Sequence, residues 1–345
     1  MKTRKSKKTV FVTGSDGMLG SNVVRELLTQ GYRVKAMVQP GRNPKTISDL
    51  KGVEIVYGDL LDWEKIKQLM RGCDSVIHTA AYAASWPSRS PRYFDINVTG
   101  TQNVINAALF HRVNRFVHIS SSNTQGFSES KKTPGTETTP WRGDQGMDYA
   151  LSKKIAHEKV EKAIAEQNLP AVFICPGFMF GAFDTGPTSG QLLISAWNQD
   201  LKFCTKGGKN FVSASDVAKA TVNALTLCQV GETYICGNQN LEFKELFEII
   251  EDVTGIPQPK RVIPAFIVEI TGMIMDFVGK ITGKKPPLSF AMARNANLRM
   301  YYRADKAIKQ LKMPQTDLRT AIKDAYRWFG ENGYLKNYDR QIFPS

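Results

Sequence analysis

Tyr149 and Lys153 are the residues whose types and spacing most clearly predict chemistry. They stand four positions apart at the start of an expected helix, 149–167, so both side chains lie on one helical face. A lysine ammonium beside a phenol favours phenolate and lowers the phenol pKa from its usual value of about 10. A tyrosine tuned in this way can give a proton to, or take one from, a secondary alcohol near neutral pH. An ordinary amphipathic helix can carry the same pattern, but here it lies 28 residues after Ser121 in a serine cluster and downstream of a glycine-rich loop.

The glycine-rich loop, TGSDGMLG at residues 13–20, stands between an expected strand and an expected helix. Its glycines permit a tight turn, let the backbone approach a pyrophosphate and let the helix pack on the strand, and the helix N-terminus attracts phosphate charge. The strand before and the helix after are the context that this motif requires. The sequence therefore predicts a dinucleotide site, whose contacts include Gly14, Gly17, Met18, Leu19 and Gly20.

The residues after the second expected strand bear on the choice of dinucleotide. An acid there would accept hydrogen bonds from the ribose hydroxyls and would repel a 2′-phosphate. The sequence instead has Gln39 and Arg42, with Lys45 shortly after. Arg42 and Lys45 are available to pair with a phosphate, which favours NADP over NAD; in the alternative interpretation both are solvated loop cations. Gln39 and Arg42 are therefore predicted cofactor contacts.

Two further loops fit the cofactor pocket. Asp59 and Leu60 follow the third expected strand, where the carboxylate could accept from the adenine amino group. Ala80 and Ala81 follow the fourth, where small residues allow close approach. All four are predicted cofactor contacts.

The elements that must position these residues alternate in the sequence. From residue 9 to about 180, short runs rich in Val and Ile alternate with longer helical stretches, which is typical of a parallel sheet covered on both faces. We therefore predict an α/β fold with a Rossmann-like doubly wound sheet.

After residue 180 the sequence becomes rich in Gly and Pro, with only short apolar runs. Beyond these we expect a helix at 215–228, a strand at 233–236 and three or four helices within 242–332. We predict a dinucleotide-binding domain at 9–180, with 210–240 returning to it. Residues 181–209 and 241–335 then form a smaller, mostly helical substrate-binding lobe that caps the carboxyl edge of the sheet.

The formal charge of +14 is unevenly distributed. Residues 1–8 contribute +5 and residues 257–312 contribute +8, whereas residues 9–256 are balanced. A nucleic-acid-binding domain would spread basic residues over one folded face with interleaved aromatics, so no nucleic-acid partner is expected. The basic tail, 1–8, is predicted to be solvated and unstructured, or to contact an anionic membrane surface.

Cysteine and histidine usage predicts no metal site and no disulfide framework. The five cysteines include no CxxC pair, and the four histidines show no ligand spacing. The chain has no apolar run long enough to span a bilayer and no secretory signal pattern. A cytoplasmic location is therefore expected, and attachment to a membrane surface stays open as an additional hypothesis.

The hypothesis of membrane attachment rests on residues 265–281, which are nearly all apolar. The less apolar positions, at spacings of three and four, form a narrow stripe: Glu269, Gly272, Asp276 and Gly279. Two interpretations remain open. The segment is a cap helix packed on the small lobe, or it lies on a membrane surface with Lys280, Lys284 and Lys285 near the headgroups.

In its motifs and their order, the sequence resembles the extended short-chain dehydrogenase/reductase family over about residues 9–335. The matching segments are TGSDGMLG, GDLLD, HTAA, NVTGTQNV, VHISSSNTQG, YALSK, CPGFMFG and SDVAKA. The resemblance implies that Ser121 holds the substrate oxygen, that Tyr149 is the acid/base, and that Lys153 both shifts its pKa and binds the ribose. Ser121 is preferred to its two neighbours because it stands five residues before Gly126, the family's usual interval.

Further roles also follow from the resemblance alone. It implies that Asn97 helps to position the lysine through water, and that Pro176 and Gly177 line the nicotinamide. It implies a homodimer formed through the NVTGTQNV and YALSK helices.

Local departures distinguish the subgroups. Dehydratases carry an Asp-Glu pair after the catalytic hydroxyl residue, where this chain has Ser122 and Asn123. Nucleotide-sugar epimerases carry an Arg-x-x-Asn element and an Arg-Asp pair that are missing at 174–178 and 210–216. Asp216 is retained, with an expected structural role at a helix N-terminus.

The sequence instead resembles dihydroflavonol-4-reductases and 3β-hydroxysteroid dehydrogenases, through Pro176-Gly177 and the late Pro286-Pro287 pair. This resemblance implies an NADP(H)-dependent reductase of a ketone on a hydrophobic, lipid-like substrate: a 3-keto sphingoid base, a 3-ketoacyl compound or a sterol. The alternatives are a nucleotide-sugar epimerase with tightly bound NAD and a non-catalytic cofactor-sensing protein.

Overall fold

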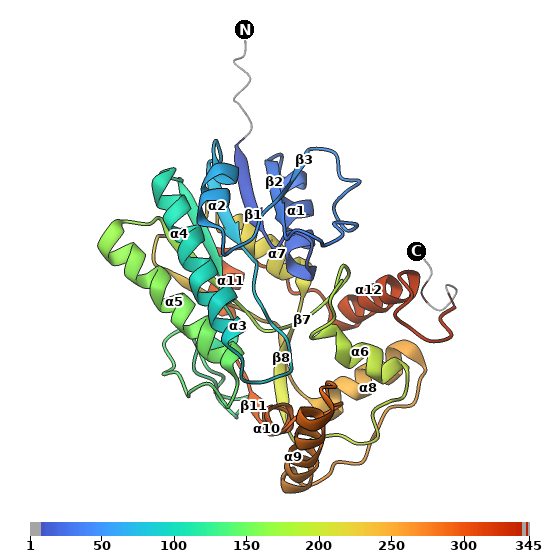
Figure 1. Ribbon diagram of the computed structural model, residues 1–345. Helices are drawn as coiled ribbons and strands as arrows, with labels where there is room; N and C mark the ends of the chain where they lie inside the picture. Colours follow the sequence, from blue (N-terminus) through green and yellow to red (C-terminus); the bar gives the residue numbers. More distant parts are fainter. Residues whose placement is uncertain (1–7, 340–342, 344–345) are drawn as a thin grey trace.

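The computed structural model describes residues 8–339 and 343. Its main feature is a seven-stranded sheet of order β3-β2-β1-β4-β5-β6-β9, in which every pairing is parallel (Figure 1). The predicted doubly wound α/β fold is confirmed. The strands are β1 Thr9–Thr13, β2 Arg33–Val38, β3 Val53–Tyr57, β4 Ser75–His78, β5 Arg115–Ile119, β6 Ala171–Pro176 and β9 Thr233–Cys236.

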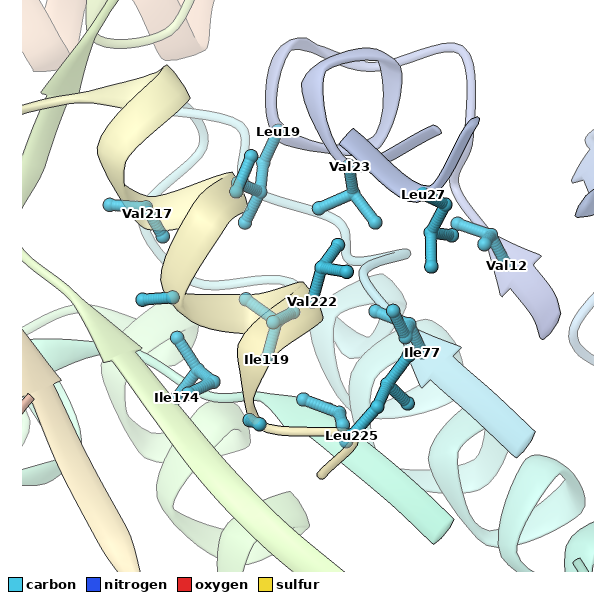
Figure 2. Close-up of a cluster of buried hydrophobic side chains, with 14 of the residues drawn as sticks. Val12, Leu19, Val23, Leu27, Ile77, Ile119, Ile174, Val217, Val222 and Leu225 are labelled. Atoms are coloured by element: carbon cyan, nitrogen blue, oxygen red, sulfur yellow. The ribbon is translucent and has the colours of Figure 1, made fainter. Parts of the chain in front are cut away.

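Helices cover both faces of this sheet. On one face lie α1 (Met18–Thr29) and α7 (Ala214–Asn223), and on the other lie α2 (Trp63–Met70), α4 (Gly100–Phe110) and α5 (Asp148–Gln167). Side chains alternate along each strand, so Val10 and Val12 of β1 pack toward α1 and α7 while Phe11 packs into the opposite core. Figure 2 shows the first of these cores, with Leu19, Val23 and Leu27 of α1 facing Val217 and Val222 of α7.

The sheet order creates a crevice at one edge. The chain winds outward from β1 to β3 and then returns to place β4 on the other side of β1. At such a reversal the loops leaving the carboxyl ends of neighbouring strands diverge, and ligands bind in the space between them. The glycine-rich loop leaves β1 at this point, and the Ala80-Ala81 segment leaves β4 beside it.

A second, smaller sheet lies beyond the carboxyl edge. Its strands are β7 (Phe178–Phe180), β8 (Gly208–Ser213), β10 (Gln239–Glu242) and β11 (Arg299–Met300), with β8 paired to all three others. Helices α6 (Gly190–Trp197), α8 (Phe243–Thr254) and α12 (Leu318–Glu331) share a core with β7 and β8. Sequence patterns did not indicate this sheet, since its strands are two to six residues long.

The helix number expected for 242–332 was too low. Five helices occupy it in the structure: α8, α9 (Ala265–Thr282), α10 (Phe290–Asn297), α11 (Asp305–Gln310) and α12. The short α10 and α11 are separated by β11, so the sequence of this segment has no regular helical pattern. In Figure 1, α9 and α10 lie at the end of the molecule opposite the start of β1.

Further sequence expectations concern the basic tail, the cysteines, metal sites and membrane-spanning helices. The predicted basic tail, residues 1–8, lies outside the described residues except for Lys8. The five cysteines are free thiols, and four of them are buried. Within residues 8–339, no group of three His, Cys, Asp or Glu side chains could hold a metal ion, and no helix is long and apolar enough to cross a membrane.

Candidate active site

The loop after β1 leaves no room for side chains at two of its glycines. Gly14 has a φ of +63°, and a Cβ there would lie 2.7 Å from the Cα of Ala80. A Cβ on Gly20 would lie 2.1 Å from the carbonyl oxygen of Gly14. Helix α1 therefore packs directly on the loop, and the loop lies directly on the end of β4.

This packing leaves a backbone cradle at the start of α1. Ser21 is the first residue whose amide donates to a helix carbonyl, that of Gly17, at 2.8 Å. The amides of Met18, Leu19 and Gly20 therefore have no intrahelical partner, and Gly17 has no side chain to cap them. Free amides at a helix N-terminus fit a pyrophosphate, so the predicted dinucleotide contacts have suitable geometry.

Hydrogen bonds hold the end of β4 against the loop. The Thr79 hydroxyl donates to the carbonyl oxygen of Thr13 at 2.6 Å, and the Ala80 amide donates to the Thr13 hydroxyl at 3.3 Å. The Thr13 hydroxyl also lies 2.7 Å from Nδ1 of the buried His78. His78 therefore has a structural role here, and Ala80, one of the two predicted cofactor contacts after β4, lies beside the glycine-rich loop.

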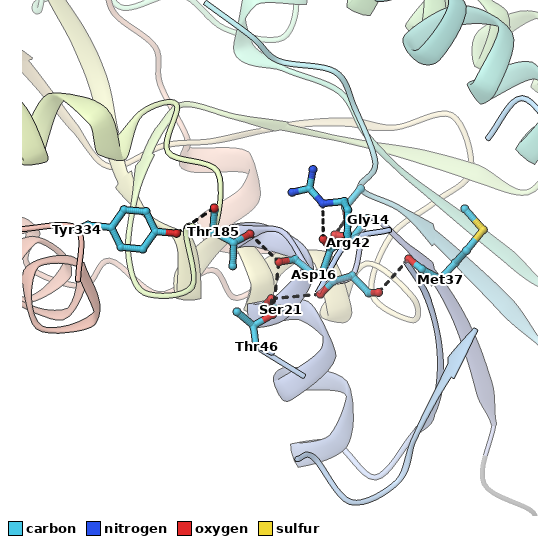
Figure 3. Close-up of polar contacts among 10 residues, drawn as sticks. Gly14, Asp16, Ser21, Met37, Arg42, Thr46, Thr185 and Tyr334 are labelled. Atoms are coloured by element: carbon cyan, nitrogen blue, oxygen red, sulfur yellow. Dashed lines mark hydrogen bonds and ion pairs between the residues drawn. The ribbon is translucent and has the colours of Figure 1, made fainter. Parts of the chain in front are cut away.

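Arg42 makes an ion pair that sequence reasoning missed. Its Nε donates to the carboxylate of Asp16 at 2.8 Å, and Asp16 is a buried residue of the glycine-rich loop. In the described part of the chain, the two terminal guanidinium nitrogens make no hydrogen bond, and Figure 3 shows them directed away from Asp16. Asp16 thus orients Arg42 and leaves its outer fork, the two terminal guanidinium nitrogens, free to bind another group. Arg42 is therefore more than a solvated loop cation.

Lys45, the other predicted phosphate partner, is directed elsewhere. Its Nζ donates to Oδ1 of Asn332 at 3.1 Å and lies 5.7 Å from the Trp328 ring centroid. The glycine-rich loop is also covered from the C-terminal side, where the Thr185 hydroxyl donates to the Asp16 carbonyl oxygen and Tyr334 donates to that of Thr185 (Figure 3). An open hollow of about 280 Å³ remains, lined by Asp16, Arg42, Asn43, Lys45 and Thr185.

The other predicted cofactor residues lie at the same edge of the sheet. Gln39 is exposed just after β2, and its carbonyl oxygen accepts from the Arg42 amide at 3.1 Å. Asp59 follows β3 and accepts from the Leu61 amide at 2.9 Å. Leu60 is buried against Gly100 of α4, where a Cβ would approach it to 2.9 Å.

Lys153 is fixed in the interior. Its side chain is buried, and Nζ donates to the carbonyl oxygen of Ile119, the last residue of β5, at 2.7 Å. Burial lowers the pKa of Lys153 to about 8. The lysine therefore remains largely cationic at neutral pH while it lies at the end of the central sheet.

Tyr149 departs from the expected electrostatics. Burial raises its pKa above the ordinary value, and the hydroxyl of Ser121, placed beside the phenol, opposes that shift. The expectation of a lowered phenol pKa was therefore wrong for the chain by itself. The spacing of four holds, but desolvation of the phenol outweighs the hydrogen bond with Ser121 that favours phenolate.

Within the serine cluster, the structure distinguishes the hydroxyl beside Tyr149 from its neighbour. Ser120 is turned into the core, where its Oγ lies 2.9 Å from Nδ1 of His157 and 3.2 Å from Oγ1 of Thr124. Ser121 begins a short 3-10 turn, Ser122–Thr124, and its Oγ accepts from the Asn123 amide at 3.2 Å. Ser121, in the turn after β5, and Tyr149 of α5 thus lie within hydrogen-bonding reach of each other, and Lys153 of the same helix is anchored to the last residue of β5.

Asn97 connects helix α5 to the segment that follows β4. The helix expected to contain NVTGTQNV begins before Asn97 in the structure, because Ser90 caps it and Pro91 fits its first turn. It runs from α3 (Pro91–Phe94) through a π-helical turn (Asp95–Thr99) into α4. Asn97 lies buried in the π-helical turn, where Nδ2 donates to Ser152 Oγ and to the Tyr82 carbonyl oxygen, both at 3.0 Å. It therefore braces α5 next to Lys153.

Pro176 and Gly177 end β6 at the same edge. A Cβ on Gly177 would lie 2.7 Å from the carbonyl oxygen of Asn210, so β6 and β8 approach closely there. Asp216, at the start of α7, accepts from the Thr316 amide at 2.8 Å and from the Thr316 hydroxyl at 2.7 Å. This is the structural use expected for Asp216.

A small hollow opens at the start of α5, where Met147 and Ala150, on either side of Tyr149 in the sequence, are part of its lining. Its lining includes Asn123, Gln125, Trp141, Met147, Asn295 and Met300. Trp141 is held there by a 2.8 Å hydrogen bond from Nε1 to the Asn123 carbonyl oxygen. Sequence reasoning missed these residues, since they come from an irregular loop, from α10 and from β11, which only the tertiary fold brings together.

Comparisons with known proteins agree with this geometry. A model of the "NAD dependent epimerase/dehydratase family" matches residues 10–237. The chain is 29% identical over 332 residues to "Putative dihydroflavonol 4-reductase" of Synechocystis sp., covering 94% of this chain and 96% of the relative. It is 26% identical over 336 residues to "Sterol demethylase protein B" of Methylococcus capsulatus, covering 95% and 100%. It is 26% identical over 309 residues to "2-alkyl-3-oxoalkanoate reductase" of Shewanella oneidensis, covering 85% and 78%.

Proposed function

Since this chain belongs to the NAD-dependent epimerase/dehydratase family, within the extended short-chain dehydrogenases/reductases, it is an NAD(P)-dependent oxidoreductase-type enzyme, and we propose that it reduces a ketone on a hydrophobic, lipid-like molecule with NADPH. One observation carries the proposal. The Ser121 hydroxyl lies beside the Tyr149 phenol, and Lys153, one turn further along α5, is anchored at the end of β5, on the same carboxyl edge where the glycine-rich loop offers a cradle for a dinucleotide.

Each of the three side chains has a distinct task in the reduction. The nicotinamide supplies the hydride when it is bound. The Ser121 hydroxyl donates a hydrogen bond to the carbonyl oxygen, which polarises the carbonyl and holds it near Tyr149. The Tyr149 phenol gives its proton to that oxygen as the alcohol forms.

The electrostatics of the site suit this direction. Because burial raises the pKa of Tyr149, the phenol is protonated at neutral pH, which is the form that a proton donor requires. The Lys153 ammonium, held by Ile119, stabilises the phenolate that remains after proton transfer. Asn97 and Ser152 brace the turn of α5 that carries both residues.

Arg42 supports NADPH as the cofactor. The fit is visible in the chain itself: Asp16 holds the guanidinium by Nε at the rim of the hollow, and the outer fork is left for an oxyanion such as a 2′-phosphate. No carboxylate follows β2 to repel that phosphate. Lys45 contributes less in this proposal, because Asn332 and Trp328 hold it at the C-terminal side.

The proposed substrate class rests on the relatives' names and on the hollow at the start of α5. Two relatives are named as reductases, one of a 3-oxoalkanoate, and a third is named for sterols. The hollow combines apolar side chains, Trp141, Met147 and Met300, with polar and charged ones: Asn123, Gln125, Arg142, Asp144 and Gln145. Such a lining suits a carbonyl on an apolar skeleton.

A ketone panel tests this function. Purified protein is mixed with NADPH or NADH and with 3-ketoacyl, 3-keto sphingoid and 3-ketosteroid compounds of increasing apolar size, and oxidation of the cofactor is followed by absorbance. We expect turnover with NADPH that rises with apolar size. Interconversion of a nucleotide sugar without net cofactor oxidation would replace the proposal with the epimerase alternative.

A further inference from the structure

Helix α9 exposes a wide apolar face. Eight of its large apolar side chains are between 41% and 70% exposed, more than half of all such exposed side chains in the described part of the chain. They are Phe266, Ile267, Ile270, Met273, Ile274, Phe277, Val278 and Ile281. An apolar surface of this extent is typical of a docking site.

The polar side of the same helix faces the protein. A Cβ on Gly272 would lie 2.7 Å from Cβ of Ala293 in α10, and one on Gly279 would lie 3.0 Å from Pro286. Asp276 accepts from Nε1 of Trp86 at 2.9 Å. The less apolar stripe seen in the sequence is therefore the buried contact, and packing on the small lobe leaves the apolar face outward, the reverse of an ordinary surface helix.

The charge around this face selects its partner. Glu269 and Asp276, the two carboxylates of α9, lie on the inward side, where Glu269 accepts from Asn297, and Asp276 accepts from Trp86 and pairs with Lys280 at 3.5 Å. Lys280 at the end of α9 and the following Lys284 and Lys285 are exposed. The face thus combines apolar side chains with cations at one end. A second copy of the chain would bring the same cations together, whereas an anionic lipid surface complements them.

We propose that the exposed face of α9 docks on anionic phospholipid membranes, with its apolar side chains in the interfacial layer and Lys280, Lys284 and Lys285 against the headgroups. No helix within residues 8–339 is long and apolar enough to span the bilayer, so α9 lies in the interface.

The docking surface is connected to the candidate active site. Trp86, which donates to Asp276, belongs to the segment that leaves β4 after Ala80 and Ala81. Helix α10 packs on α9, and its Asn295 lines the hollow at the start of α5. On the proposed function, on which this step rests, docking brings the substrate side of the enzyme to the membrane that holds its lipid-like ketone.

Vesicle co-sedimentation tests the docking surface without any turnover. The full chain is mixed with vesicles of phosphatidylcholine alone or of phosphatidylcholine with phosphatidylglycerol. We expect binding to the anionic vesicles and release by salt. The double variant Phe277→Glu/Ile281→Glu should bind the anionic vesicles about 10-fold more weakly, because carboxylates replace apolar groups at the lipid interface.

A matched control separates this effect from general loss of exposed apolar area. Leu227 and Val230 are 41% and 48% exposed away from α9, so Leu227→Glu/Val230→Glu should bind vesicles like the unchanged chain. Circular dichroism melts establish that both variants are folded. Equal vesicle binding by the α9 variant, no binding by the unchanged chain, or self-association that the α9 variant abolishes would each overturn the proposal.

Parallel assays of a water-soluble short-chain ketone distinguish this inference from the proposed function. Ketone reduction without vesicle binding would overturn the docking surface alone. Vesicle binding without reduction of any ketone would overturn the proposed function and leave the docking surface in place.

Discussion

Nζ of Lys153 lies 2.7 Å from the carbonyl oxygen of Ile119, to which it donates a hydrogen bond across the gap between α5 and the end of β5. Ile119 stands two residues before Ser121, so one contact ties the helix that carries Tyr149 to the strand that leads into the serine. The three side chains of the candidate centre are thereby held in fixed relation. The lysine also brings a positive charge into a buried site, and this has consequences that can be measured.

The pH dependence of ketone reduction follows from Lys153. Because burial lowers its pKa to about 8, the ammonium is present below that pH and is lost above it. Tyr149, with a raised pKa, stays protonated over the same range. We expect kcat/KM for reduction to be level below pH 8 and to fall by about tenfold per pH unit above it. A rise in kcat/KM through pH 8 to 9 would contradict this assignment of the two protonation states.

The serine cluster offers a matched pair of variants. Ser121→Ala should lower kcat by about 10²-fold, because the hydroxyl that polarises the carbonyl is removed. Ser120→Ala removes hydrogen bonds to His157 and Thr124 in the core and should cost about 1 kcal/mol of unfolding free energy with little change in kcat. Steady-state kinetics and urea unfolding of both variants check this. The reverse ranking in kcat would move the catalytic role to Ser120.

Cofactor choice depends on Arg42. Arg42→Ala should raise KM for NADPH by about tenfold or more, since a charge-assisted contact to the 2′-phosphate is lost, while KM for NADH stays nearly the same. Asp16→Asn weakens the orienting ion pair and should produce a smaller shift of the same kind. The ratio of kcat/KM for the two cofactors is the measurement. Equal losses with NADPH and NADH would show that Arg42 only supports the loop.

Close packing at the glycine-rich loop predicts a difference between two alanine substitutions. A Cβ on Gly20 would meet the Gly14 carbonyl oxygen at 2.1 Å, so Gly20→Ala should cost about 3 kcal/mol or more of unfolding free energy and abolish NADPH binding. A Cβ on Gly17 would lie at 3.5 Å from the same oxygen, an ordinary contact, so Gly17→Ala should destabilise much less. Urea unfolding and NADPH fluorescence compare them, and equal stabilities would show that α1 can move away from the loop.

Much of the sheet and of the dinucleotide site could be predicted from the sequence, because the signals are local. Short Val-rich runs such as β1 predict strands from their composition. Glycines between a strand and a helix, as at residues 13–20, predict a tight turn. Tyr149 and Lys153 are neighbours by helical geometry alone.

The features that could not be predicted depend on tertiary contacts. The ion pair between Asp16 and Arg42 could not be predicted, because only the fold brings these two residues together. The pKa of Tyr149 depends on how much water the finished site admits, which spacing does not give. In α9 the sequence separates two faces, but only the fit of Gly272 on α10 shows which face is inward.

Comparison of Tyr149→Phe with the unchanged enzyme tests the central claim most directly. Ketone reduction is measured at saturating NADPH, and NADPH binding is measured separately by fluorescence. We predict a fall in kcat of about 10²-fold or more, since the proton donor is lost, with the Kd for NADPH within about twofold. Retention of kcat, or loss of NADPH binding together with kcat, would contradict Tyr149 as the acid of an NADPH-dependent ketone reductase.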